Sequence, residues 1–107
     1  MNISVESRKM PFTQLTVEAV PHGKGVYILW DNDKIVYVGV ADGSNGLYGA
    51  LVDHISEARE PGATYVRYFQ VEVCAEVGIR QKQLLEECKH TFGSYPQFND
   101  KLLESST

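Results

Sequence analysis

The sequence has few cysteines and no long apolar run. Its 107 residues include only two cysteines, Cys74 and Cys88, which are too far apart for a C-x-x-C motif and are expected to be reduced, largely buried thiols. A disulfide is the less favoured alternative. A zinc site is disfavoured further, because paired Cys/His clusters are lacking. No segment approaches the roughly 18 apolar residues of a membrane span, so no membrane association is expected.

A secretory signal and an excess of basic residues are also missing. The first twelve residues, MNISVESRKMPF, contain no apolar signal-peptide core, so a cytoplasmic location is expected. The formal net charge is −4, whereas proteins that bind nucleic acid usually carry a basic surface. The charge therefore disfavours tight, non-specific DNA binding, but it allows a local basic patch or a protein partner.

What remains is typical of an ordinary globular domain. Apolar residues make up 43% and charged residues 22% of the chain, and the length predicts a single domain over residues 1–107. Hydrophobic spacing predicts, in order, a short helix (or a strand) within 12–20, strands over 26–30 and 35–40, a helix over 47–59, a strand over 64–73 and a helix over 79–92. This order predicts an α+β fold, a small three-stranded antiparallel sheet flanked by helices.

The two strands around the turn at 31–33 carry a paired pattern of tyrosine and glycine. GVY (25–27) lies on the first strand and YVG (37–39) on the second. Tyrosine is common in strands and glycine often borders them, so core or half-buried packing is the favoured explanation of the pattern taken alone. The later elements favour a functional site: a helix with His54, a helix rich in carboxylates, and the motif P-x-x-N (96–99).

With these motifs the chain resembles the GIY-YIG nuclease family over about residues 24–99. The closing stretch LLEECKHTFGSYPQFN is also similar to the family's last helix and Pro/Asn segment. The resemblance implies metal-dependent hydrolysis of nucleic-acid phosphodiester bonds, with DNA as the expected substrate and one Mg²⁺ or Mn²⁺ ion as cofactor. In such a site a glutamate holds the metal, a tyrosine positions or deprotonates water, and an arginine offsets charge on the phosphate.

Carried over residue by residue, the resemblance assigns catalytic positions to Tyr27, Tyr37, His54 and Asn99, and binding positions to Gly25 and Gly39. The family's arginine position falls on Ala50, which has no charge. Arg59 follows on the same predicted helix, about 13 Å along the axis, too far to replace it directly. A natural loss and an engineered substitution at Ala50 both stay open. His54 at the helix–sheet boundary is equally well explained by packing.

The metal-binding glutamate has two candidate positions. Spacing back from Pro96 and Asn99 indicates Glu87, whose alternative interpretation is a surface carboxylate. The helical relation to the apolar residues 84 and 85 indicates Gln81 instead, and glutamine binds metal ions less well than a carboxylate does. We take Glu87 as the candidate metal ligand and Gln81 as the alternative position.

Two functions follow from these observations. The first is a GIY-YIG-type endonuclease, with this sequence impaired because Ala50 stands at the arginine position. The second is a non-catalytic domain of the same fold that binds nucleic acid or a protein partner, a second copy of the chain included. Ala50, Gln81 and the negative net charge favour the second.

Overall fold

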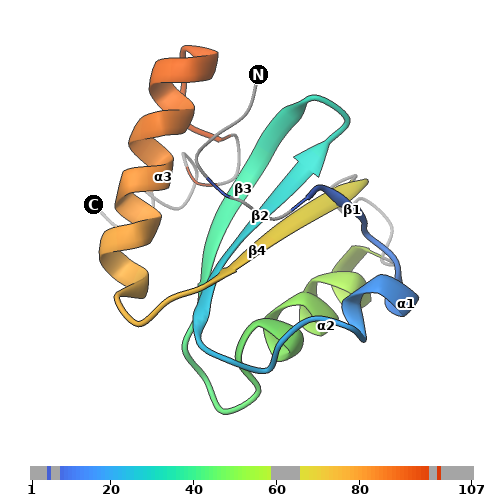
Figure 1. The fold of residues 1–107 in the computed structure, drawn as a ribbon. Coiled ribbons are helices and arrows are strands. Elements are labelled where there is room, and N and C mark those ends of the chain that lie inside the picture. The colour runs from blue at the N-terminus through green and yellow to red at the C-terminus, as the bar shows by residue number, and fades with distance from the viewer. Residues whose placement is uncertain (1–4, 6–7, 59–65, 97–98, 100–107) are drawn as a thin grey trace.

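A four-stranded antiparallel sheet separates two layers of helix. The computed structural model describes Val5, residues 8–58 (without the side chains of 56–58), residues 66–96 and Asn99. In chain order the elements are β1 (Met10–Pro11), α1 (Gln14–Val17), β2 (Gly25–Asp31), β3 (Lys34–Ala41), α2 (Gly46–Ala58), β4 (Tyr68–Val73) and α3 (Val77–Phe92). The strand order is β1-β4-β2-β3, with α1 and α2 on one face and α3 on the other (Figure 1).

The predicted α+β class is confirmed, but the sheet has four strands rather than three. The additional strand, β1, is two residues long and pairs Met10 with Phe69 and Pro11 with Tyr68. A strand of two residues is too short to show alternation of apolar and polar residues. Proline is rare in central strands, because it has no N–H to donate, so the sequence did not indicate β1. Proline is tolerated here because β1 lies at the sheet edge.

The remaining boundaries differ from the predicted ranges by a few residues. The first helix is a single turn, α1, which Thr13 caps by accepting a hydrogen bond from the backbone N–H of Thr16. The strand predicted over 64–73 is β4, which begins at Tyr68, and residues 59–65 lie outside the described part of the chain. The last helix, α3, begins two residues earlier than predicted and ends at Phe92, and Gly93, with a positive φ of 85°, forms its left-handed cap.

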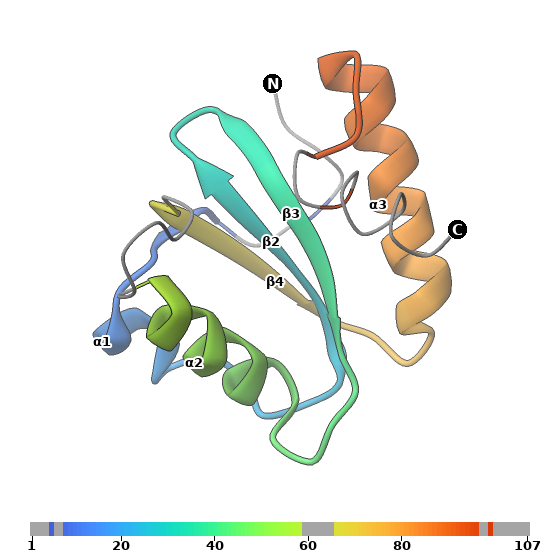
Figure 2. The same ribbon diagram turned by 180° about the vertical axis from the view of Figure 1, so that it is seen from behind.

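Each face of the sheet has its own hydrophobic core. Between the sheet and α3 lie alternate residues of β2, Val26, Ile28 and Trp30, packed with Leu84 and Cys88. The intervening residues of β2 point to the other core, which α1 and α2 cover (Figure 2). Because side chains alternate along a strand, β2 supplies both cores and is buried from Gly25 to Trp30.

A β-bulge shifts the register of the β2–β3 hairpin between Leu29 and Trp30. Leu29 pairs with Tyr37 and Trp30 with Ile35, so Val36 is the extra residue on β3. As a result Val36 and Tyr37, although adjacent, both pack against the core beneath α2. The bulge therefore determines the face on which the second tyrosine lies.

In the described part of the chain, no helix has the length and apolar character needed to cross a lipid bilayer.

Candidate functional site

The β2–β3 hairpin brings the two tyrosine–glycine motifs together on one face. Tyr27 lies directly across from Gly39, and the rings of Tyr27 and Tyr37 are 6.0 Å apart between centroids. Tyr27 is 5% exposed, whereas Tyr37 is half-buried. Both tyrosines thus lie on the α2 side of the sheet, where Tyr37 keeps partial access to solvent.

Gly39 is the residue that makes room for the first tyrosine. A Cβ atom at this position would lie 2.2 Å from Cζ and 2.4 Å from the hydroxyl of Tyr27, far inside any real contact. The Tyr27 ring therefore crosses β3 where β3 has no side chain. The small size of Gly39, predicted to serve binding, is used for packing within the chain itself.

Gly25 is also required by close packing. A Cβ atom there would lie 2.1 Å from the backbone oxygen of Glu72 on β4 and 3.0 Å from Leu47 on α2. The glycine lets the end of β2 approach β4 and the first turn of α2. Both glycines of the paired motif thus shape the site by allowing close approach.

His54 joins the two tyrosines from α2. Helical spacing buries Leu47 and Leu51 against the sheet and brings His54, seven residues after Leu47, to the half-buried margin. Its Nε2 atom is 2.9 Å from the Tyr27 hydroxyl, and the imidazole tautomer decides which of the two donates the hydrogen bond. The His54 ring also lies 5.7 Å from the Tyr37 ring, so three rings form one cluster.

Ala50 lies one helical turn before His54 and is packed against the same core. It offers no donor and no charge, so an arginine function is not supplied from this position. Arg59, considered above as a replacement, lies outside the described residues.

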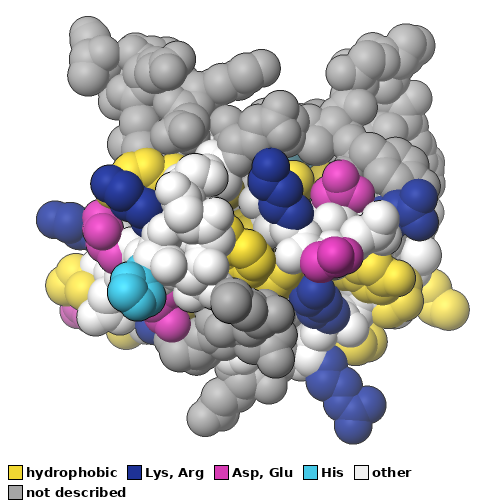
Figure 3. Space-filling model, turned by 90° about the horizontal axis from the view of Figure 1, so that it is seen from above, with side chains coloured by type: hydrophobic (Ala, Val, Ile, Leu, Met, Phe, Trp, Pro, Cys, Tyr) yellow, Lys and Arg dark blue, Asp and Glu magenta, His cyan; other side chains and the backbone are white. Residues whose placement is uncertain are grey.

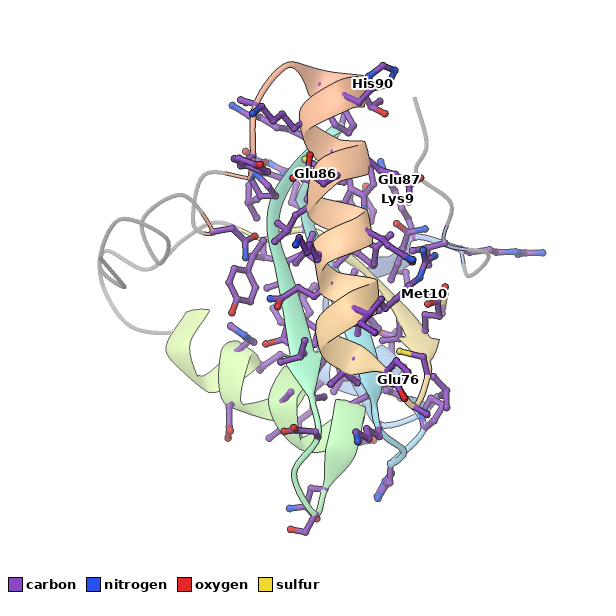
Figure 4. All side chains as sticks on the ribbon, turned by 90° about the vertical axis from the view of Figure 1, so that its left-hand side faces the viewer. Lys9, Met10, Glu76, Glu86, Glu87 and His90 are labelled. Carbon is purple, nitrogen blue, oxygen red and sulfur yellow. The ribbon has the colours of Figure 1, made fainter. Side chains whose placement is uncertain are left out.

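The two candidate positions for the metal-binding carboxylate differ in their surroundings. Glu87 lies 3.9 Å from Arg80 and lines the outer surface of α3 with residues such as Lys82 and His90. Figure 4 shows Glu87 on the side of α3 away from α2. Gln81 instead lies against the sheet and donates a hydrogen bond of 3.1 Å to the backbone oxygen of Val38. The structure therefore brings Gln81, and not Glu87, next to the YVG segment.

Asn99 is buried beside the same segment. It is 3% exposed, accepts a hydrogen bond of 2.7 Å from the Val38 amide and donates one of 3.0 Å to the Val38 oxygen. Its carboxamide is thus occupied by the backbone of β3. The sequence marked Asn99 as a site residue, but it did not indicate this partner, 61 residues away.

The three-ring cluster contains no carboxylate among the described residues that form it. Among all residues that the structure describes, no group of three or more His, Cys, Asp or Glu side chains is arranged to hold a metal ion. The side chains at the three-ring cluster are two phenols and an imidazole, while Mg²⁺ prefers carboxylate and other oxygen ligands. The Mg²⁺ or Mn²⁺ ion stays a prediction that depends on the family resemblance alone.

The pKa values of three groups outside the ring cluster are raised, and burial is the main cause for the Cys74 thiol. The hydrogen bonds that Arg80 donates to Glu72, one of them 2.9 Å long, raise the pKa of the guanidinium. Burial raises the pKa of the Cys88 thiol to about 11. Both cysteines are free thiols, as expected, and Cys88 is buried while Cys74 is half-buried.

A second aromatic contact was not indicated by the sequence. His22, in the loop before β2, stacks on Tyr48 of α2 with ring centroids 4.5 Å apart and planes 13° apart. The two residues are far apart in the chain, and their types alone give no sign of the pairing. The stack lies where the backbone oxygen of Gly23 accepts a hydrogen bond from Leu47, so it covers the first turn of α2.

On the face shown in Figure 3, basic and acidic side chains are interspersed, and no large patch of one charge is visible.

Comparison of the chain with protein-family models, with curated proteins and with solved structures finds no match. The resemblance to the GIY-YIG family is therefore carried by the motifs and their order.

Proposed function

We propose that the chain is a GIY-YIG-like domain that binds the phosphodiester backbone of nucleic acid, with DNA as the expected ligand. The Tyr27–His54–Tyr37 cluster is the binding site, and phosphodiester hydrolysis is impaired in this sequence. The observation that carries the proposal is the hydrogen bond of 2.9 Å between the Tyr27 hydroxyl and His54. It joins the GVY strand to the helix that the family resemblance places at the site.

The chemistry of the cluster suits a phosphate better than an apolar ligand. Phenol and imidazole groups donate hydrogen bonds to phosphate oxygens, and such contacts make up a large share of protein–DNA hydrogen bonds. Tyr37 and His54 are half-buried, and their rings lie against each other and against the buried ring of Tyr27. A preorganised, partly exposed cluster of donors is what an anionic backbone requires.

Impaired hydrolysis follows from two positions. Ala50 supplies no cation to offset charge on the phosphate, and Gln81 is an amide bonded to the backbone of β3. Charge stabilisation by a cation and an arginine is a large part of catalysis of phosphodiester cleavage. Binding without efficient cleavage is the expected behaviour of such a site.

Fluorescence anisotropy with a short labelled DNA duplex at low salt tests the binding site. We expect His54→Ala to weaken binding at least about tenfold, because losing a hydrogen bond to a charged group costs about 1.5–3 kcal/mol. His90→Ala is the matched control, since His90 is exposed on the outer surface of α3, and its affinity should stay within about twofold. Equal affinities of the two variants would contradict the proposed site.

A plasmid-nicking assay with Mg²⁺ or Mn²⁺ tests the second part of the proposal. The unmodified chain should leave supercoiled DNA intact, and Ala50→Arg alone should not restore cleavage, because position 81 still carries an amide. Nicking by the unmodified chain would show an active nuclease. Nicking by Ala50→Arg only would show that the missing arginine is the sole defect.

A protein-binding domain is the second candidate function, and the net charge of −4 favours it. In that case no variant would bind DNA even at low salt, where phosphate contacts are strongest. Sedimentation velocity of the isolated chain would then show whether the partner is a second copy.

A further inference from the structure

Val38 stands at the outer edge of the sheet, where β3 has no neighbouring strand among the described residues. Its backbone is nevertheless fully hydrogen-bonded by two side-chain amides. Asn99 accepts from the Val38 N–H at 2.7 Å and donates to the Val38 oxygen at 3.0 Å. Gln81 donates to the same oxygen at 3.1 Å, so both lone pairs of that carbonyl are used.

This arrangement reproduces the hydrogen bonds of a further strand. A carboxamide carries one acceptor and one donor side by side, as a peptide group does. Asn99 therefore pairs with both backbone groups of Val38, as a neighbouring antiparallel residue would. Only an amide supplies this pattern, because a carboxylate has no donor at neutral pH.

The position of the clamped residue links it to the ring cluster. Val38 lies between Tyr37, whose ring packs near His54, and Gly39, over which the Tyr27 ring crosses. The Val38 side chain points to the opposite core, toward α3. Anchoring the Val38 backbone from outside therefore fixes the strand segment that carries half of the site.

We propose that Gln81 and Asn99 form a backbone clamp on Val38 and are positioning residues for the ring cluster. The amide at position 81 is required as a hydrogen-bond donor and is not a substitute metal ligand. A carboxylate there would face the Val38 carbonyl oxygen without a proton between them. That the cluster binds nucleic acid rests on the function proposed above, whereas the clamp is testable on the isolated protein.

Two substitutions at position 81 and one control test the clamp. Gln81→Glu keeps the shape but removes the donor at pH 7, and Gln81→Met keeps the length with no polar group. Gln83→Glu makes the same chemical change on the exposed surface of α3, away from Val38. The readouts are the NMR chemical shift of the Val38 carbonyl carbon, whose oxygen accepts the Gln81 hydrogen bond, and the NMR ring signals of Tyr37 and His54.

We expect both position-81 variants to move the Val38 carbonyl-carbon signal upfield, because its oxygen loses one of its hydrogen bonds. Their Tyr37 and His54 ring signals should shift, while Gln83→Glu changes neither the carbonyl signal nor the ring signals. In Gln81→Glu alone, the carbonyl signal should return toward its original position below about pH 4.5, where a protonated carboxyl again donates to the Val38 oxygen. A general loss of packing would not show this pH dependence.

An unchanged Val38 carbonyl signal, or unchanged ring signals, in both position-81 variants would overturn the clamp. A carbonyl shift in Gln81→Glu that does not reverse at low pH would overturn the requirement for a donor. Neither readout involves DNA, so failure of the clamp is distinguishable from failure of the proposed binding site.

Discussion

Gly39→Ala is the substitution whose effect the structure defines most closely. The new Cβ atom would lie 2.2 Å from Tyr27 Cζ, whereas ordinary contacts begin near 3.4 Å. The ring or the strand must therefore give by about 1.2 Å. The Tyr27–His54 hydrogen bond, now 2.9 Å, would then be broken.

The expected loss of stability follows from two contributions. Overpacking a buried site costs about 1–3 kcal/mol, and the lost hydrogen bond adds about 0.5–1.5 kcal/mol. A total of about 1.5–4.5 kcal/mol corresponds to a fall in Tm of at least about 6 °C for a domain of this size. Thermal and urea denaturation, followed by circular dichroism, measure both quantities.

Gly43→Ala is the matched control, because a Cβ atom there would meet no other atom within 4 Å. A double-mutant cycle with Tyr27→Leu then isolates the clash, since without the ring Gly39→Ala should cost less than about 1 kcal/mol. If Gly39→Ala melts within 2 °C of Gly43→Ala, roughly the effect of less than 1 kcal/mol, the packing explanation of the YVG glycine is refuted.

Three further predictions concern groups outside the ring cluster. Cys88, whose pKa burial raises to about 11, should react with iodoacetamide at pH 8 far more slowly in the folded protein than in urea. The thiol ionises at lower pH in the unfolded chain than in the folded protein. The free energy of unfolding should therefore decrease as the pH rises from about 9 to 11, and a flat profile would contradict this. Gln70→Leu should lower the free energy of unfolding, measured by urea denaturation, by about 1–3 kcal/mol. The substitution leaves the buried indole N–H of Trp30 without its acceptor, which is now 2.8 Å away, and an unchanged stability would contradict the contact. Glu72→Gln should lower the free energy of unfolding by at most about 1 kcal/mol, because the ion pair of Glu72 with Arg80 is partly exposed. A much larger loss of stability would contradict this expectation.

Most of the fold was predictable because its residues are periodic. Alternation along β2 and β3 indicated the hairpin, and the spacing of Leu47 and Leu51 indicated α2. The β-bulge at Leu29 and Trp30 was not predictable, because it depends on how two strands align rather than on either pattern. The short strand β1 was missed for a related reason, since two residues show no period.

The candidate site was predictable in part. The tyrosines and His54 were named from their motifs, and the structure brings their rings together. Position 81 shows why local reasoning is limited. The helical relation to residues 84 and 85 indicated position 81, and the structure does place Gln81 against the sheet. Counting back from Pro96 and Asn99 indicated Glu87 instead, which lies on the outer surface of α3. The partner of Gln81 is 43 residues away and is a backbone atom, which leaves no trace in the sequence.

The most direct test of the proposed binding site is an NMR titration of histidine-labelled protein with a short DNA duplex. The chain has three histidines in three surroundings: His54 in the ring cluster, His22 stacked on Tyr48, and His90 exposed on α3. We predict that the imidazole signals of His54 shift and saturate, and that those of His22 and His90 stay in place. Shifts confined to His22 or His90, or no shift at low salt, would contradict a nucleic-acid site at Tyr27, Tyr37 and His54.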